Sequence, residues 1–245
     1  MKIVGVMLLH NEDAYARQAA LNVREFCDEI VVIDNGSTDD TVAEVQAAGV
    51  DRIIHEPDLT KTHDHVQDYS GTQTWVFGVD GDELYDPNGL RELRTRLLAG
   101  RYGNAFQIKG RYVHALAIDT TLGEAIGYAG PPSHNPTKLY NFSNLDWPSD
   151  GRHILFQARP RHETGEIVTL RNGWDDSVLR CLHMRFLRRS SQEDERTLGR
   201  RLHGEDKLGF GSSKERDNDG GNLRPSYQRG ELHRVATAPF FGGSQ

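Results

Sequence analysis

Short apolar runs alternate with amphipathic segments along the first hundred residues. The apolar runs predict buried strands over residues 3–9, 29–34, 51–56 and 74–80. Helices are predicted between them over residues 13–27 and 38–49, the second with acidic residues at its start and Gly49 at its end. This alternation predicts an α/β fold, in which a mostly parallel sheet with right-handed crossovers is flanked by helices.

The pattern is less regular after residue 86. A helix is predicted from Pro87 to Leu98, a half-exposed strand over residues 105–115, and short strands over residues 137–142 and 152–156. Glycine and proline between residues 123 and 136 predict a long connection, and residues 203–230 have almost no apolar periodicity. We therefore expect one domain over residues 1–202, followed by a loop-rich, mobile C-terminal segment over residues 203–245.

Composition narrows the class of protein. The chain has 245 residues and a formal net charge of −7, which argues against general binding to nucleic acid or anionic membranes. Cys27 and Cys181 lie far apart among apolar neighbours and make no disulfide framework. The first apolar run stops after Leu9, and no segment approaches the roughly 20 apolar residues of a membrane span. We expect a cytoplasmic protein without a transmembrane segment.

The strand ends carry the functional information, because ligands of open parallel sheets bind there. The first strand runs into "LHNED", which lacks the glycines of a dinucleotide site, and no GxxxxGK[ST] loop is present. The second strand runs into "DNGSTDDT", in which Gly36 permits a sharp turn and the hydroxyl and acidic residues can cap a helix. Capping does not explain Asp34, which could accept hydrogen bonds from a nucleobase or ribose.

An acidic cluster follows the fourth predicted strand. Asp80 and Asp82, with Gly81 between them, can converge on one hard cation, and oxygen ligands favour Mg²⁺ or Mn²⁺. Three acids this close would repel one another without a cation. A calcium loop is excluded because its sixth position would be Tyr85 instead of glycine. A solvated acidic turn is the structural alternative, and Glu83 is expected to tether the loop.

"VVIDNGSTDDT" followed by "WVFGVDGDE" resembles the family 2 glycosyltransferases of the GT-A fold, and the opening "LLHNED" fits the same pattern. The resemblance covers residues 1–100, which would form the nucleotide-sugar-binding half, with residues 101–202 as the acceptor half. It implies that Asp80 and Asp82 hold Mn²⁺ or Mg²⁺ against the diphosphate of a nucleotide-sugar donor, preferably a UDP-sugar. The implied donor contacts are His10, Asn11, Glu12, Asp34, Gly36, Asp39, Lys61, Asp80 and Arg185.

The resemblance also implies an inverting transfer, in which a side-chain base takes the proton of the acceptor hydroxyl. "KLYNFSNLDWPSDGRHIL" is similar to a segment that ends in His-Glu, but Ile154 replaces the glutamate, so Asp150 and His153 are the candidate catalytic residues. "VLRCLHMRFLRRSS" makes His183 a candidate metal ligand or diphosphate contact. Its basic residues Arg185, Arg188 and Arg189 could neutralise phosphate.

Other functions remain open at this point. A nucleotidyltransferase also binds metal at strand ends but usually begins with a Gly-rich, basic turn, and a noncatalytic relative would bind a nucleotide-sugar without turnover. His63 and His65 could share one face of an extended segment as metal ligands, although a solvated loop is favoured there. The acceptor, whether a saccharide, a lipid-linked sugar or another hydroxyl compound, and the oligomeric state are not specified.

Overall fold

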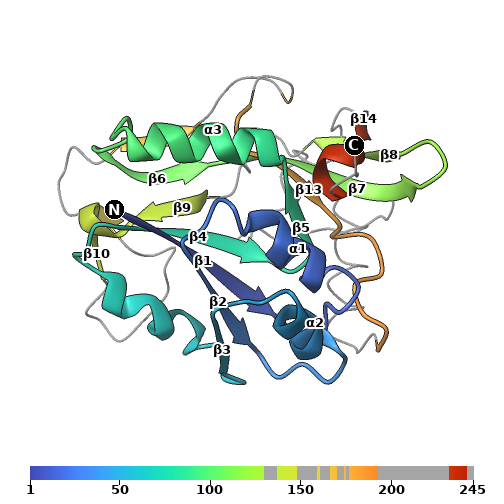
Figure 1. Cartoon of the computed structure of the whole chain (residues 1–245), viewed down its shortest axis with the longest axis horizontal. Coiled ribbons are helices and arrows are strands. Elements are labelled where there is room, and N and C mark those ends of the chain that lie inside the picture. Colours follow the sequence, from blue (N-terminus) through green and yellow to red (C-terminus); the bar gives the residue numbers. More distant parts are fainter. Residues whose placement is uncertain are drawn as a thin grey trace, which may run out of the picture.

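A seven-stranded sheet is built on the four strands predicted first. The computed structural model describes residues 1–129, 137–147, 159–160, 166–169, 174, 177–192 and 232–241. Its largest sheet has the order β12-β6-β9-β4-β1-β2-β3, and all its pairings are parallel except those of β9 (Figure 1). Its strands are β1 (Lys2–Leu9), β2 (Glu29–Asp34), β3 (Arg52–His55), β4 (Thr74–Asp80), β6 (Ala105–Lys109), β9 (Thr137–Asn141) and β12 (Glu166–Thr169).

The strand order changes direction between β1 and β4. From β1 the chain adds β2 and β3 on one side, and then returns to place β4 on the other. Such a point in an open α/β sheet leaves a crevice at the carboxyl ends of the strands. The expected mostly parallel α/β fold is confirmed. The segments that follow β1, β2 and β4 meet at this edge of the sheet.

Helices cover both faces of this sheet, which explains why its strands read as continuous apolar runs. Ile3, Met7 and Leu9 of β1 belong to a core beneath α1 (Ala16–Val23), α2 (Thr41–Ala47) and α3 (Pro87–Leu98). Val4 and Val6 face the opposite side, under the 3₁₀ helices η1 (Thr62–Tyr69) and η3 (Phe142–Asn144). No helix in the described ranges has both the length and the apolar character needed to cross a bilayer.

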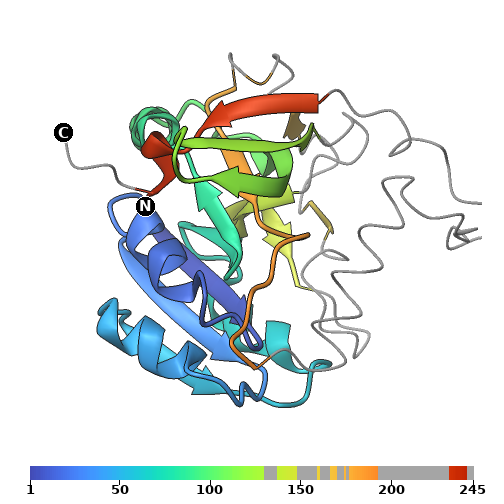
Figure 2. The same cartoon turned by 90° about the vertical axis from the view of Figure 1, so that its right-hand side faces the viewer.

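A second sheet of five strands has the order β14-β8-β7-β13-β5. Figure 2 shows β14 beside β8, with β7 and β13 next in the sheet. Only Gly81 and Asp82 separate β4 from β5, so the acidic cluster lies where the chain passes from the first sheet to the second. The strands are β5 (Glu83–Tyr85), β7 (Arg111–Asp119), β8 (Glu124–Ala129), β13 (Arg180–His183) and β14 (Leu232–Ala236); β10 (Leu145–Asp146) and β11 (Arg159–Pro160) pair separately.

Several predictions for the second half of the chain were wrong. The expected strand over residues 105–115 is two strands in different sheets, divided at Gly110, where a side chain would press on Leu179. The expected connection after residue 122 contains β8, and the segment around His63 forms η1. Residues 232–241 form β14 and α5 (Ala238–Phe241), with Phe240 buried, although they fall in the segment expected to be mobile. The predicted strand over residues 152–156 and the loop over residues 203–230 lie outside the described residues.

Candidate functional site

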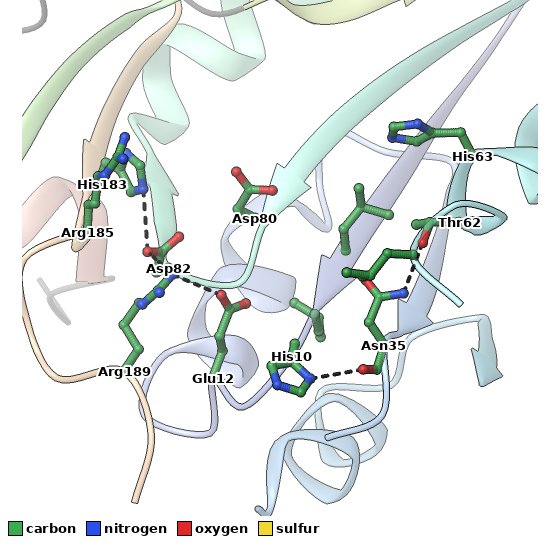
Figure 3. Close-up of a pocket in the computed structure, with 13 residues that line it drawn as sticks. His10, Glu12, Asn35, Thr62, His63, Asp80, Asp82, His183, Arg185 and Arg189 are labelled. Atoms are coloured by element: carbon green, nitrogen blue, oxygen red, sulfur yellow. Dashed lines mark hydrogen bonds and ion pairs between the residues drawn. The ribbon is translucent and has the colours of Figure 1, made fainter. Parts of the chain in front are cut away.

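A cleft of about 360 Å³ opens at the carboxyl ends of β1 and β4. It lies at the change of strand order, and side chains from both halves of the chain reach it (Figure 3). β1 contributes its last residues, β4 contributes Asp80, and the segment after β13 contributes two arginines. The lining residues are Leu8, Leu9, His10, Glu12, Asn35, Leu59, Thr62, His63, Asp80, Asp82, His183, Arg185 and Arg189.

The two aspartates of the acidic cluster occupy different environments. The side chain of Asp80 is 48% exposed and lies in the cleft, whereas Asp82 is fully buried. Asp82 Oδ2 lies 2.8 Å from Arg189 Nη1 and 3.4 Å from His183 Nε2, while its Oδ1 has no hydrogen-bond partner among the described residues. Burial alone would raise the pKa of Asp82, but His183 and Arg189 outweigh it and hold that pKa well below its ordinary value. Asp82 is therefore a buried carboxylate with one oxygen left to bind a ligand.

Glu83 ties the acidic cluster to the second sheet. Its Oε2 accepts hydrogen bonds from the Asp80 amide at 3.0 Å and from Tyr85 Oη at 2.8 Å, and its Oε1 accepts one from Tyr112 Oη at 2.5 Å. The ammonium of Lys138 on β9 lies 2.8 Å from the same Oε2. Burial raises the pKa of Glu83, and Lys138 opposes that rise. With all these partners Glu83 supports the loop and does not face the cleft.

Two cations of the protein neutralise the acidic cluster. Lys138 Nζ lies 3.5 Å from Asp80 Oδ2 in addition to its contact with Glu83, and Arg189 Nη1 is shared between Glu12 and Asp82. Burial disfavours the ammonium form of Lys138, but Asp80 and Glu83 outweigh it and raise its pKa above the ordinary value. The argument that these acids need a metal to relieve their repulsion was therefore wrong, because each acid has a protein cation beside it.

His183 is oriented by a second histidine. The register of β13 on β7 places it opposite His114, and the two Nδ1 atoms lie 3.1 Å apart. Burial, with the nearby His183 and Arg185, lowers the pKa of His114 well below its ordinary value, so His114 is neutral at physiological pH. Because one Nδ1 must donate to the other, this contact fixes the His183 ring with its Nε2 toward Asp82.

The loop after β1 braces the acidic cluster from the other side. Glu12 Oε2 accepts a hydrogen bond from the Gly81 amide at 3.1 Å, and a Cβ at Gly81 would collide with that oxygen. Asn11 is buried at φ 53° and accepts a hydrogen bond from the Thr38 amide through its Oδ1 at 2.7 Å. His10 Nδ1 donates to the carbonyl oxygen of Asn35 at 2.9 Å. Glycine is needed at position 81 for this close approach of two loops, more than for flexibility.

The predicted donor contacts divide into two groups. His10, Glu12, Asp80 and Arg185 line the cleft, whereas Asn11, Asp34, Gly36, Asp39 and Lys61 do not. Asp34 is buried, with Oδ1 accepting from the Ser37 amide at 3.0 Å and Oδ2 paired with His55 Nδ1 at 2.8 Å. Asp39 accepts from the Thr41 amide at 3.0 Å and from Ser190 Oγ at 2.6 Å. The described contacts of these two acids hold loops in place.

Asp80, Asp82 and His183 are side chains of the cleft lining that could hold a divalent cation. Two carboxylates and an imidazole match the ligand preferences of Mn²⁺ and, less well, of Mg²⁺. Asp82 offers such an ion its buried, unpartnered Oδ1, and Asp80 offers a half-exposed carboxylate in the cleft. The described residues include no ready-made cluster of three or more His, Cys, Asp or Glu ligands. A divalent ion held here would need further ligands from water or a bound substrate, and Arg189 already holds one oxygen of Asp82.

Comparison with known families decides where the chain belongs. The sequence model described as "Glycosyl transferase family 2" matches residues 6–191, about three quarters of the chain. The chain belongs to glycosyltransferase family 2. Its mostly parallel seven-stranded sheet and the cleft beside Asp80 are thus features of a family 2 protein.

Similar proteins match over shorter stretches. The lipopolysaccharide core biosynthesis glycosyltransferase LpsC of Rhizobium meliloti is 37% identical over an alignment of 102 residues, and the match covers 36% of this chain and 34% of LpsC. The uncharacterized glycosyltransferase RT0209 of Rickettsia typhi is 32% identical over 83 residues, which is 34% of this chain and 28% of that protein. These matched regions amount to about a third of each curated relative. Glucosyl-3-phosphoglycerate synthase of Mycobacterium tuberculosis, solved with Mn²⁺ and UDP, superimposes with a TM-score of 0.37 and 24% identity, covering 45% of this chain and 44% of that one.

The catalytic base of this family 2 chain stays a prediction. Asp150 and His153, the two candidates, lie outside the described residues. Sequence reasoning missed Lys138 and His114, although a lysine in the apolar strand "TKLYNF" and a histidine in "RYVHA" are polar exceptions in buried runs. It named Arg189 as a phosphate contact, whereas the structure pairs Arg189 with Glu12 and Asp82. His65 does not line the cleft and pairs with Glu56 at 3.1 Å.

Proposed function

We propose that this chain is a metal-dependent, inverting glycosyltransferase that moves a sugar from a nucleotide-sugar, preferably a UDP-sugar, to an acceptor hydroxyl. One observation carries the proposal: in a family 2 chain, an exposed carboxylate and a buried carboxylate with an unpartnered oxygen share the cleft at the ends of β1 and β4. Asp80, Asp82 and His183 would hold Mn²⁺ or Mg²⁺. When bound, the cation neutralises charge on the departing diphosphate.

The remaining cleft residues would bind and orient the donor. Arg185, on the wall formed after β13, is suited to phosphate oxygens. Burial lowers the pKa of His63, so at neutral pH it offers the donor a neutral imidazole. The apolar side chains of Leu8 and Leu59 give the cleft surfaces against which a base or sugar ring can pack.

The acceptor hydroxyl attacks the anomeric carbon from the side opposite the diphosphate. A new C–O bond forms while the bond to the diphosphate oxygen breaks, and the hydroxyl proton passes to a base, for which Asp150 and His153 are our candidates. The similarity to LpsC supports a lipid-linked core saccharide as acceptor. Cys27 and Cys181 are buried free thiols, which supports a reducing compartment such as the cytoplasm.

A donor panel tests this function. The protein is incubated with UDP-, GDP- and dTDP-sugars, a truncated lipopolysaccharide core and Mn²⁺, and nucleoside diphosphate and glycosylated product are measured. We expect turnover with one donor class, loss of turnover with a chelator, and recovery when Mn²⁺ is restored. Release of pyrophosphate from a nucleoside triphosphate and a sugar phosphate would indicate a nucleotidyltransferase instead. Metal-dependent nucleotide binding without turnover on any acceptor would indicate a noncatalytic relative.

A further inference from the structure

Two buried polar atoms of opposite character lack partners in the wall of the cleft. They are Oδ1 of Asp82 and Nη2 of Arg189, and neither has a hydrogen-bond partner among the described residues. A buried polar atom that is left unsatisfied destabilises the fold. Both side chains line the cleft. Asp82 Oδ1 lacks a hydrogen-bond donor or a cation, and Arg189 Nη2 lacks an acceptor, among the described residues. The pair indicates a ligand that brings positive and negative charge together.

Arg189 is held firmly on the carboxylate that a metal would use. Its side chain is only 6% exposed, and its Nη1 lies 2.8 Å from Asp82 Oδ2 and 3.1 Å from Glu12 Oε1. The backbone around it is also anchored, since the carbonyl of Arg189 accepts a hydrogen bond from the Ala14 amide at 3.0 Å and Ser190 Oγ bonds Asp39. The guanidinium therefore occupies one oxygen of the proposed metal ligand (Figure 3).

We propose that Arg189 is a resident counter-cation of Asp82 that competes with the divalent cation, and that a cation and a diphosphate displace it together. The cation would bind the carboxylate, and the guanidinium would turn to the phosphate oxygens, which can accept from both Nη1 and Nη2. This inference rests on the metal and donor of the proposed function. It adds that Arg189 weakens the binding of the cation alone and favours its binding together with the diphosphate, without Arg189 itself taking part in the transfer of the sugar.

The competition predicts how the two ligands affect each other. A cation that binds Asp82 alone meets the like charge of Arg189 on the same carboxylate, and to the extent that it displaces the guanidinium it leaves Glu12 as the other described anionic partner. A cation that binds with a nucleoside diphosphate brings a new anionic partner for the guanidinium with it. Cation binding should therefore be weak alone and strengthened by the nucleotide, and by linkage the cation should strengthen nucleotide binding by the same factor.

Measurement of Mn²⁺ affinity without nucleotide distinguishes this role from a purely structural one. We would titrate the protein with Mn²⁺ at pH 7.5 and follow free Mn²⁺ by electron paramagnetic resonance, for wild type, Arg189→Gln and Arg188→Gln. Arg188, expected from the sequence to neutralise phosphate, does not line the cleft. It is the matched control, because it is exposed, carries the same charge and bonds only the carbonyl oxygens of Ser190 and Ser191 among the described contacts. We expect Arg189→Gln to bind Mn²⁺ about tenfold more tightly, since a like charge is removed at short range, and Arg188→Gln to stay within about twofold of wild type.

A second titration with UDP present measures the coupling. We expect UDP to strengthen Mn²⁺ binding about tenfold more in wild type than in Arg189→Gln, because only wild type regains a partner for the guanidinium. If Arg189→Gln does not fold, as judged by circular dichroism, the charge-balanced variant E12Q/R189Q replaces it, since the side-chain amide oxygen introduced at position 12 can still accept from the Gly81 amide. Tighter Mn²⁺ binding than in Arg188→Gln is again expected, by a smaller factor than for Arg189→Gln alone, because the guanidinium on Asp82 is gone while the negative charge of Glu12 is lost as well.

The outcomes separate this inference from the proposed function. If wild type binds Mn²⁺ but Arg189→Gln, or its charge-balanced replacement, binds no more tightly than Arg188→Gln, the competition is wrong while the metal site stands. If no variant binds Mn²⁺ with or without UDP, the inference and the metal dependence of the proposed function both fail.

Discussion

Replacing Asp80 with asparagine should lower kcat/KM for sugar transfer about a thousandfold, because it removes one negative charge from the proposed cation site at the mouth of the cleft. Asp80 is a better test than Asp82. Its side chain is 48% exposed, and its ion pair with Lys138 is long, at 3.5 Å. Loss of a half-exposed ion pair of this kind costs at most about 1 kcal/mol of folding stability. A loss of activity in Asp80→Asn would therefore reflect chemistry and not unfolding.

Asp40→Asn is the matched control for this variant. Asp40 is an exposed carboxylate at the start of α2, it makes no side-chain capping bond, and it does not line the cleft. Steady-state kinetics on the donor identified by the panel should give a kcat/KM within about twofold of wild type for Asp40→Asn. Near-wild-type activity in Asp80→Asn would contradict the assignment of Asp80 to the cation site.

Replacing Lys138 with methionine should destabilise the fold by about 3–5 kcal/mol, since it strands the buried carboxylate of Glu83. The ammonium of Lys138 lies 2.8 Å from Glu83 Oε2, and both side chains are almost fully buried. Urea unfolding followed by circular dichroism measures the change in the free energy of unfolding. The melting temperature should fall by about 10 °C for a chain of this size.

Lys2→Met provides the comparison for Lys138→Met. Lys2 also pairs with a glutamate, Glu29, at 2.6 Å, but its side chain is 47% exposed, so the cost should stay below about 1 kcal/mol. The double variant E83Q/K138M should regain about half of the stability lost in Lys138→Met, because the stranded charge is removed. A cost for Lys138→Met no larger than that for Lys2→Met would mean that the ion pair does not hold the two sheets together.

The first half of the fold was predictable because its signals are local. Each of β1 to β4 is a short apolar run, and parallel strands bring their carboxyl ends to one edge whatever follows them. That rule alone places Asp80 and His10 in one cleft, as the structure does. Asp34 ends a strand at this same edge, but it does not line the cleft, because its carboxylate bonds Ser37 and His55; its neighbour Asn35 lines the cleft instead.

The counter-cations were not predictable, because their contacts depend on long-range pairings. Lys138 reaches Glu83 only because β9 inserts antiparallel between β4 and β6. Arg189 lies 107 residues from Asp82, and its position depends on β13 pairing with both β5 and β7. The segment from Asp80 to Glu83 contains three acids and no basic residue, so its charge alone suggested that a cation was missing. The fold supplies Lys138 and Arg189 from distant segments as the counter-cations. Charge repulsion is therefore no evidence for a metal, and the unpartnered oxygen of Asp82 is the observation that supports one.

The most direct test of the central claim is anomalous diffraction from crystals of the protein grown with Mn²⁺ and UDP. The account predicts one strong manganese peak in the cleft, bound by the side chains of Asp80 and Asp82, with the diphosphate of UDP against it and Arg189 turned away from Asp82. A manganese peak outside the cleft, or UDP bound there without manganese, would contradict the proposed metal-dependent donor site.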